Sequence, residues 1–200
     1  MSIKSNKNNL NKKYNCHQAQ KEEIQSVYAL ARKYLGENIA SLHKMLLWHD
    51  RNPEMFNVVY RISGSHDNRK ETFVGFFCLI PISNMAVDRL KSKEMTGAGF
   101  ELEHIMKANE NPDAIYIGAL VADGMMAQGT TNYFMQREIT DYWGIKTNAV
   151  YSRPTTNEGM NMMEKYGFHA ADPLDAHKIN CLHTKQISEY KSENNISSAT

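Results

Sequence analysis

The stretch from Ala114 to Val121 constrains this chain most, because its residues are apolar with almost no polar interruption. Alternate residues of an extended chain point to opposite sides, which places Ile115, Ile117, Ala119 and Val121 on one side and Tyr116 and Leu120 on the other. Apolar residues on both sides are typical of a strand that is covered on both faces. The pattern therefore predicts a central strand of a sheet.

A helix is predicted after a break at Asp123-Gly124. From Gln128 onward apolar and aromatic residues recur near helical spacing until Gly144, namely Tyr133, Phe134, Ile139, Tyr142 and Trp143. The first turn of a helix carries unpaired N–H groups and the positive end of the helix dipole, which together bind phosphate. Gly129 allows close backbone approach there, and Thr130 and Thr131 add hydroxyl donors. A buried strand, loop and helix without a ligand give the same pattern.

The other segments alternate between predicted helices and strands. Helices are predicted over 18–35, over a second segment that ends between Trp48 and Asn52-Pro53, and over 84–93. Strands are predicted over 56–62 and 71–82, which form a hairpin, near Tyr151, and over 177–187. Residues 13–17 are the candidate for a first strand.

A second informative segment lies downstream, where Val150–Gly159 is typical of a strand end, a turn and a capped helix that stops at Gly167-Phe168. Together with 114–143, this segment resembles the GNAT acyltransferase superfamily, whose members use acetyl-CoA or a related acyl-CoA. In that family the loop after a central strand opens a helix that receives the CoA pyrophosphate, and a later helix ends in Gly-Phe. The resemblance implies an α/β fold of the GNAT type, a mixed twisted sheet with helices on both faces.

The resemblance also implies which residues bind acetyl-CoA. At a bulge in the central strand, backbone groups of Ala119, Leu120 and Val121 are expected to pair with the pantetheine and the thioester oxygen. The family's pyrophosphate loop corresponds to Met126, Ala127, Gln128, Gly129, Thr130 and Thr131, in which Gly129 alone keeps a family glycine. Thr156 and Asn157 correspond to an asparagine that contacts CoA from the later helix.

Three side chains are candidates for proton transfer. Glu103 and His104 precede the central strand, where many GNAT proteins have an acidic residue beside the acceptor pocket, and either group is able to take the proton of an attacking amine. Tyr116 is a candidate for lining the pocket or delivering a proton, although a large aromatic residue in a buried strand is also a usual core residue. The family's tyrosine acid is replaced by Met163, which has no proton to give.

Composition limits the classes of partner and the location that the sequence predicts. Lys and Arg number 23 against 22 Asp and Glu, a formal charge of +1, so neither a nucleic acid nor a membrane is predicted as a partner. Cys16, Cys78 and Cys181 are widely spaced and odd in number, which favours reduced thiols and a cytoplasmic location. No Cys or His cluster predicts a metal site, and no apolar run approaches the ~18 residues of a transmembrane helix.

These patterns predict one acetyltransferase domain over 17–187, between a flexible N-terminal arm (1–16) and a flexible C-terminal tail (188–200). The expected activity is direct transfer of an acetyl group from acetyl-CoA to a primary amine of a small molecule or peptide, by a monomer or homodimer. Two alternatives stay open. One is an acyl-CoA-binding or sensor module with weak or no catalysis, and the other is a protein-binding α/β domain that binds no nucleotide.

Overall fold

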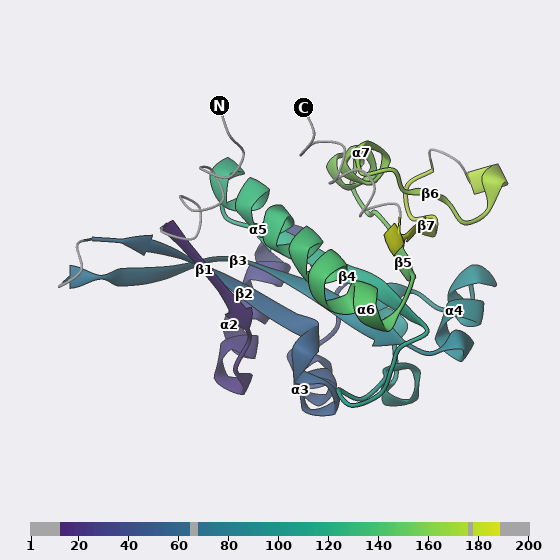
Figure 1. The fold of residues 1–200 in the computed structure, drawn as a ribbon, viewed down its shortest axis with the longest axis horizontal. Helices are drawn as coiled ribbons and strands as arrows, with labels where there is room; N and C mark the ends of the chain where they lie inside the picture. Colours follow the sequence, from purple (N-terminus) through teal and green to yellow (C-terminus); the bar gives the residue numbers. More distant parts are fainter. Residues whose placement is uncertain (1–12, 65–67, 176–177, 189–200) are drawn as a thin grey trace.

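The computed structural model describes residues 13–64, 68–175 and 178–188. They are organised around a seven-stranded sheet with the order β1-β2-β3-β4-β5-β7-β6 (Figure 1). The strands are β1 (Tyr14–Gln18), β2 (Phe56–Ser63), β3 (Lys70–Ile82), β4 (Ala114–Ala122), β5 (Ala149–Ser152), β6 (His169–Ala170) and β7 (His183–Gln186). Neighbouring strands are antiparallel except β4 and β5, which are parallel.

Helices cover both faces of this sheet. One face packs against α2 (Ile24–Leu35), α3 (Leu42–Arg51) and α4 (Asn84–Lys91). The other packs against α5 (Met125–Arg137), the π-helix η6 (Glu138–Trp143) and α7 (Asn157–Lys165). Short helical turns are α6 (Gly144–Lys146), η1 (Lys21–Glu23), η2 (Pro53–Met55), η4 (Gly97–Gly99), η5 (Leu102–His104) and η7 (Pro173–Asp175). The predicted α/β fold with a mixed sheet is confirmed.

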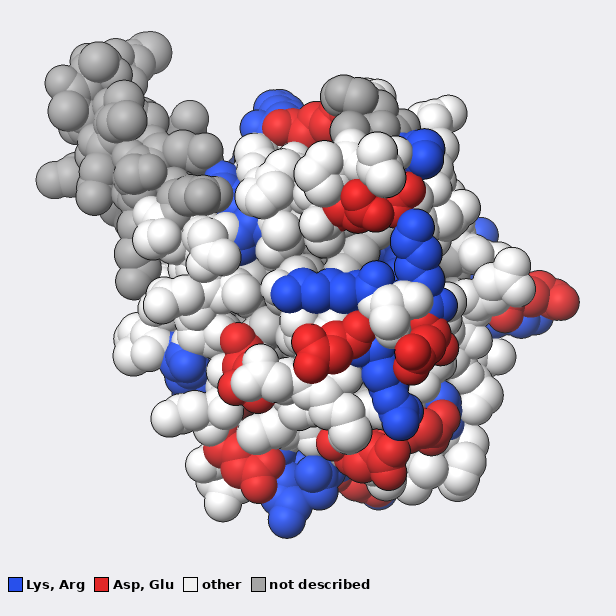
Figure 2. Space-filling model, turned by 90° about the vertical axis from the view of Figure 1, so that its right-hand side faces the viewer, with Lys and Arg blue, Asp and Glu red and all other residues white. Residues whose placement is uncertain are grey.

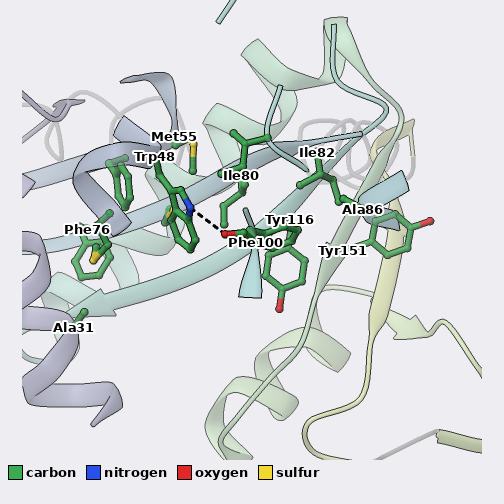
Figure 3. Packing of buried hydrophobic residues seen from close by; sticks show 14 of the residues in the cluster. Ala31, Trp48, Met55, Phe76, Ile80, Ile82, Ala86, Phe100, Tyr116 and Tyr151 are labelled. Atoms are coloured by element: carbon green, nitrogen blue, oxygen red, sulfur yellow. Dashed lines mark hydrogen bonds between the residues drawn. The ribbon is translucent and has the colours of Figure 1, made fainter. Parts of the chain in front are cut away.

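A separate apolar core fills each face. On the side of α2, α3 and α4, large side chains from strands and helices meet, and the Trp48 indole donates a hydrogen bond to the Phe100 carbonyl at 3.2 Å (Figure 3). On the side of α5, Trp143 and Ile139 are fully buried against Ile115 and Leu79. The two cores fix the sheet between helical layers and hold β4 at its centre.

The predicted faces of β4 are wrong beyond Ile117. Ile115 and Ile117 pack on the α5 side as one set, but Ala119 and Val121 belong to the opposite core. The cause is a register shift with β3, because Gly118 is an extra residue that has no partner in the ladder. One extra residue moves every later side chain of the strand to the other face.

Two segment boundaries also differ from expectation. Strand β1 starts at Tyr14, so the last residues of the expected flexible arm belong to the sheet; residues 1–12 and 189–200 of the arm and tail lie outside the described residues. The last strand is His183–Gln186 and is shorter than predicted, because a positive φ of 66° at Asn180 interrupts the extended chain before it. His177 lies outside the described residues.

Candidate functional site

β4 and β5 separate near the middle of the sheet. Their parallel pairing runs from Ile115 opposite Val150 to Ile117 opposite Ser152. β5 ends there, whereas β4 continues to Ala122. Beyond Ile117, no described strand therefore pairs with β4 on the β5 side. Openings at the carboxyl ends of parallel strands are the usual ligand sites of α/β sheets.

Gly118 lies at the start of this opening. It is exposed, although the four residues before it in β4 are buried. A Cβ atom at this position would lie 3.1 Å from Ile80 Cδ1, so a glycine lets the bulge approach the core closely. Because a bulge leaves backbone polar groups outside the ladder, N–H and C=O groups near Gly118 are candidates for contact with a ligand.

The bulge thus lies one residue before the predicted set of Ala119, Leu120 and Val121. Ala119 and Leu120 are half-buried and follow the bulge, while Val121 is buried in the core. Gly118 was absent from the predicted residues. A glycine inside an otherwise apolar strand is the sequence signal of a bulge and is the feature that indicates this position.

The N-terminus of α5 is the second element of the candidate site. The helix begins at Met125 after Gly124, whose φ of 96° favours glycine. Among the described residues, no side chain caps this end. The Gln128 N–H group bonds to the Gly124 carbonyl at 2.9 Å, so the free amides of the first turn belong to Met125, Met126 and Ala127.

Three other helices, α3, α4 and α7, are capped at this position by a side chain. Ser41 accepts a hydrogen bond from the Lys44 amide at the start of α3, and Ser83 does the same for the Ala86 amide of α4. Thr156 accepts from the Gly159 amide at the start of α7. Since these caps satisfy donors that α5 leaves free, the α5 terminus is the one of these four suited to an external anion.

The start of α5 is open to solvent, and one carboxylate lies close to it. No heavy atom lies within 4 Å of the position of a Cβ at Gly124, and Met125 and Met126 are 89% and 74% exposed, so a ligand has open access. Asp123 brings a carboxylate close by, but it accepts hydrogen bonds from Tyr34 at 2.5 Å and Lys33 at 3.4 Å. These bonds hold the pKa of Asp123 below its usual range, and Lys33 offsets its charge.

The prediction that Gly129, Thr130 and Thr131 open the helix is wrong. α5 starts at Met125, which places these residues in the second turn. The Thr130 hydroxyl donates to the Met126 carbonyl at 2.9 Å, and Thr131 is fully buried against the sheet beside Gly75. Neither hydroxyl therefore faces a ligand at the helix terminus. Gln128 and Gly129 are exposed on the outer side of the helix.

Glu103 and His104 lie away from the opening. Ile105, the next residue, bridges to Ile82 on the side of β3 that faces away from β4. The segment that follows η5 is therefore two strands away from the β4–β5 opening, and the His104 ring is separated from Tyr116 by the Phe100 ring, with centroid distances of 6.4 and 5.2 Å. The Glu103 side chain is 66% exposed, and its carboxylate lies 3.8 Å from the His104 ring.

The ring of His104 is buried and already engaged. Its Nδ1 atom accepts a hydrogen bond from the Glu101 amide at 3.0 Å. Its Nε2 atom lies 3.1 Å from the Arg89 guanidinium, which is able only to donate, so both ring nitrogens face donors of the protein. The ring has no free lone pair to offer an amine in this arrangement, so its geometry does not support a role as general base.

Tyr116 is the candidate side chain nearest to the opening. It lies two residues before Gly118, and its ring packs edge-on against Phe100 at 5.2 Å, on the side of α2, α3 and α4 (Figure 3). Gly97 provides room for its hydroxyl, since a Cβ there would lie 2.6 Å from the oxygen. Burial raises the pKa of Tyr116 to about 12, so the phenol stays protonated at neutral pH.

Thr156 and Asn157, the predicted CoA contacts of the later helix, lie at the start of α7. The Thr156 oxygen accepts from the Gly159 amide at 3.0 Å as a helix cap, and Asn157 beside it is exposed. Met163 is buried in the core on the α5 side. Tyr166 lies at the end of the helix, where its hydroxyl accepts a hydrogen bond from Asn132 of α5 at 2.7 Å, so it links α7 to α5.

Two cavities lie outside the predicted residues. One of about 250 Å³ has Arg153, the residue directly after β5, in its wall, and the other of about 470 Å³ lies between β1 and the end of α5. Within the described ranges, no group of three or more His, Cys, Asp and Glu residues is placed to hold a metal ion. Among the same residues, no helix has the length and apolarity needed to span a membrane.

Comparisons with known proteins give the class of fold. No protein-family model matches the chain, and no curated protein sequence matches it. The loading GNATL domain of CurA from Lyngbya majuscula superimposes with a TM-score of 0.59 at 12% identity, over 88% of this chain and 98% of that domain. FdhC, a nucleotide-linked sugar GNAT, gives 0.54 at 12% identity, over 94% and 93% of the two chains.

A third solved structure, mosquito arylalkylamine N-acetyltransferase like 5b, gives a TM-score of 0.52 at 15% identity, over 86% of this chain and 99% of that one. These structures share the order of strands and helices far more than they share residues. The chain therefore has the GNAT fold.

Proposed function

We propose that this protein transfers an acetyl group from acetyl-CoA to a primary amine by direct attack in a ternary complex. The observation that carries this proposal is the bulge at Gly118, which exposes β4 backbone where β5 ends. The uncapped start of α5 follows β4 after two residues, so a diphosphate site and a thioester site lie on one continuous segment. The GNAT fold supports the same proposal.

The residues that hold the cosubstrate are mostly backbone donors. The amides of Met125, Met126 and Ala127 bind the diphosphate, with help from the positive end of α5. The freed groups of Gly118 and Ala119 pair with the pantetheine amides and with the thioester oxygen. Acetyl-CoA itself supplies an acyl carbon that an amine is able to attack and a thiol that leaves.

The chain contributes position and electrostatics to the reaction. An amide donor on the bulge stabilises the negative charge that the carbonyl oxygen gains as the new N–C bond forms and the C–S bond breaks. Fixing the thioester in the opening converts the attack into a reaction between neighbours, which lowers the entropic barrier. Neither effect needs a side chain, and this agrees with the apolar character of β4.

Proton transfer then depends mainly on water. The segment that follows Glu103 and His104 is two strands away from the opening, and Tyr116 stays protonated because burial raises its pKa to about 12. We therefore assign the loss of the amine proton to solvent, and give Tyr116 the role of a hydrogen-bond donor at the wall of the opening. The thiolate is stable enough to leave without an acid, since a simple thiol has a pKa of about 8.5.

A second candidate function is an acyl-CoA sensor that binds the cosubstrate without turnover. The observation in its favour is that, among the described residues, the predicted catalytic side chains do not converge on the opening. Both functions use the same backbone site. They differ in whether an amine reaches the thioester.

The test is to mix the purified protein with acetyl-CoA and a panel of primary amines, and to measure release of free thiol. Acetyl transfer predicts release that depends on both the protein and an amine. Binding of CoA by calorimetry without thiol release from any amine would favour the sensor. Absence of CoA binding well above micromolar concentration, with no thermal stabilisation, would remove both functions.

A further inference from the structure

The cavity lined by Arg153 lies next to the end of β5. Ser152 and Ile117 form the last parallel pair, so Arg153 and Gly118 are the first residues beyond it on their strands. Adjacent strands lie ~4.8 Å apart, which keeps these two backbones close where the strands begin to diverge.

The cavity and α5 lie on opposite faces of the sheet. Arg153 donates to the carbonyls of Met95 at 3.2 Å and Leu90 at 3.3 Å, next to α4, and Leu90 and Leu182 of the cavity wall belong to the core on that face. α5 packs on the other face. A cosubstrate held by α5 and an acceptor held in the cavity would thus approach the opening from two sides without competing for space.

The charges that line the cavity leave a positive excess. Lys91, Lys93 and Arg153 face two carboxylates, those of Asp172 and Asp175. The Asp175 carboxylate is already bound by Lys93 at 2.9 Å and by Lys178 at 3.4 Å, bonds that hold its pKa below the usual range. Arg153 is held by backbone carbonyls, so its charge stays at the wall of the cavity.

Lys91 is the cation of this cavity with the greatest freedom. Its ammonium lies 5.7 Å from the centre of the Tyr151 ring, and no carboxylate of the described residues pairs with it. The side of the molecule that carries α4 and β6 shows lysines and arginines interspersed with acidic residues (Figure 2). Such a mixed surface suits a ligand with one small anionic group better than a polyanion.

We propose that the Arg153 cavity binds the acceptor and selects amines that carry a carboxylate, with Lys91 pairing with that carboxylate and the amine reaching the opening at Gly118. This inference rests on the proposed acetyl transfer. It adds the substrate class, an amino carboxylic acid, and a specificity residue outside the predicted set.

The test uses matched acceptors that differ only in the anion. Glycine, 4-aminobutyrate and 6-aminohexanoate are compared with their primary amides, and kcat and KM are measured from thiol release. The wild-type protein is expected to use at least one acid with a kcat/KM about tenfold above that of its amide, the effect of one charge-assisted contact. Lys91→Ala should remove this preference through KM, and Lys91→Arg should keep it.

Lys70→Ala is the matched control, because Lys70 is exposed at the distant end of β3 and does not line the cavity. Equal use of acids and amides by the wild-type protein, or an unchanged preference in Lys91→Ala, would overturn the inference and leave acetyl transfer standing. If no amine is acetylated, calorimetry measures whether 6-aminohexanoate binds to the wild-type protein and to Lys91→Ala. Binding that Lys91→Ala weakens would support the carboxylate site without the enzyme, and lack of binding would overturn it.

Discussion

The two ends of the continuous helix formed by α5 and η6 are built in opposite ways. At its N-terminus the described residues provide no side-chain cap, the flanking methionines are exposed, and the space beyond Gly124 is open. At the other end, Trp143 is fully buried and Tyr142 donates a hydrogen bond of 2.5 Å to Glu54. One end has unused backbone donors, and the other is closed by side chains.

The closed end also contains a network of charged groups. Lys146 donates to the Tyr142 oxygen at 2.5 Å and lies 4.1 Å from the centre of its ring. The same ammonium is 3.4 Å from the Glu54 carboxylate. Because these contacts join the helix to η2 at the start of β2, they stabilise the fold.

Stability and the proposed function thus depend on opposite ends of one helix. The π-helix end holds α5 against the sheet, so the other end is free to present unsatisfied amides at a fixed position. If this is correct, changes near Gly118 and Gly124 should alter activity or affinity with little effect on stability. Changes around Tyr142 should lower stability with little effect on activity or affinity.

The largest effect is expected for Gly118→Val. The branched side chain would fill the exposed bulge beside Ile80 Cδ1, which already lies 3.1 Å from the Cβ position. We expect kcat/KM for acetyl transfer to fall about a hundredfold, the range seen when an oxyanion donor is lost. Thiol-release kinetics measure it, and circular dichroism verifies the fold.

Gly129→Ala is the matched control for that change. A Cβ at Gly129 meets nothing within 4 Å, and the residue lies inside α5. This variant should keep wild-type activity and gain about 0.5–1 kcal/mol in the free energy of unfolding, because alanine favours helix over glycine. A large loss of CoA binding in Gly129→Ala would instead restore the site inferred from the sequence.

The next effect is expected for Met125→Pro at the open end. Proline is well tolerated at the first position of a helix, but it removes the N–H group. Loss of one amide donor should weaken CoA binding about tenfold while the melting temperature stays close to wild type. Met125→Ala keeps the N–H and should bind normally. Equal affinity of both variants would show that this amide does not contact the ligand.

A smaller effect on stability is expected for Tyr142→Phe at the closed end. The change removes the hydroxyl shared by Glu54 and Lys146 and should lower the free energy of unfolding by about 1 kcal/mol. Acetyl transfer per folded molecule should be unchanged, since this end lies outside the opening. Urea denaturation and thiol release on the same sample measure the two quantities. A drop in kcat with unchanged stability would contradict the separation.

The smallest effect is expected for Glu138→Gln, and it depends on pH. Burial, followed by repulsion from Glu54 and Asp141, raises the pKa of Glu138 in the folded protein. The folded state therefore holds the proton more tightly than the unfolded state, and this contribution to stability is complete at pH below the usual carboxyl range and lost as pH rises through the raised pKa. Glutamine imitates the neutral form.

The melting temperature of Glu138→Gln should accordingly exceed that of the wild type at pH 7.5, and the difference should shrink toward pH 4. Calorimetric scans across this range test the prediction. A difference that is constant with pH would assign the effect to packing and not to ionisation.

Much of the fold was predictable because its signals are local. The apolar run of β4, the hairpin of β2 and β3, and the break at Asn52-Pro53 depend on side-chain patterns within a few residues. The start of α5 was missed by three residues, because Met125, Met126 and Ala127 give no amphipathic period. An exposed methionine pair looks like a loop in the sequence, although the backbone there is helical.

The candidate site was less predictable because it depends on backbone and on tertiary contacts. Gly118 acquires its position from a register shift with β3, which no side-chain pattern of β4 alone determines. Arg153 becomes part of a cavity through carbonyls of the α4 region, far away in sequence. The sequence makes His104 a candidate base, but both of its ring nitrogens face donors, the Glu101 amide and the Arg89 guanidinium.

The most direct measurement is a crystal structure of the protein with CoA bound. The proposed function predicts that diphosphate oxygens accept hydrogen bonds from the amides of Met125, Met126 and Ala127, and that the sulfur lies in the β4–β5 opening beside Gly118. CoA bound elsewhere on the molecule, with the start of α5 empty and the opening filled by protein side chains, would contradict it.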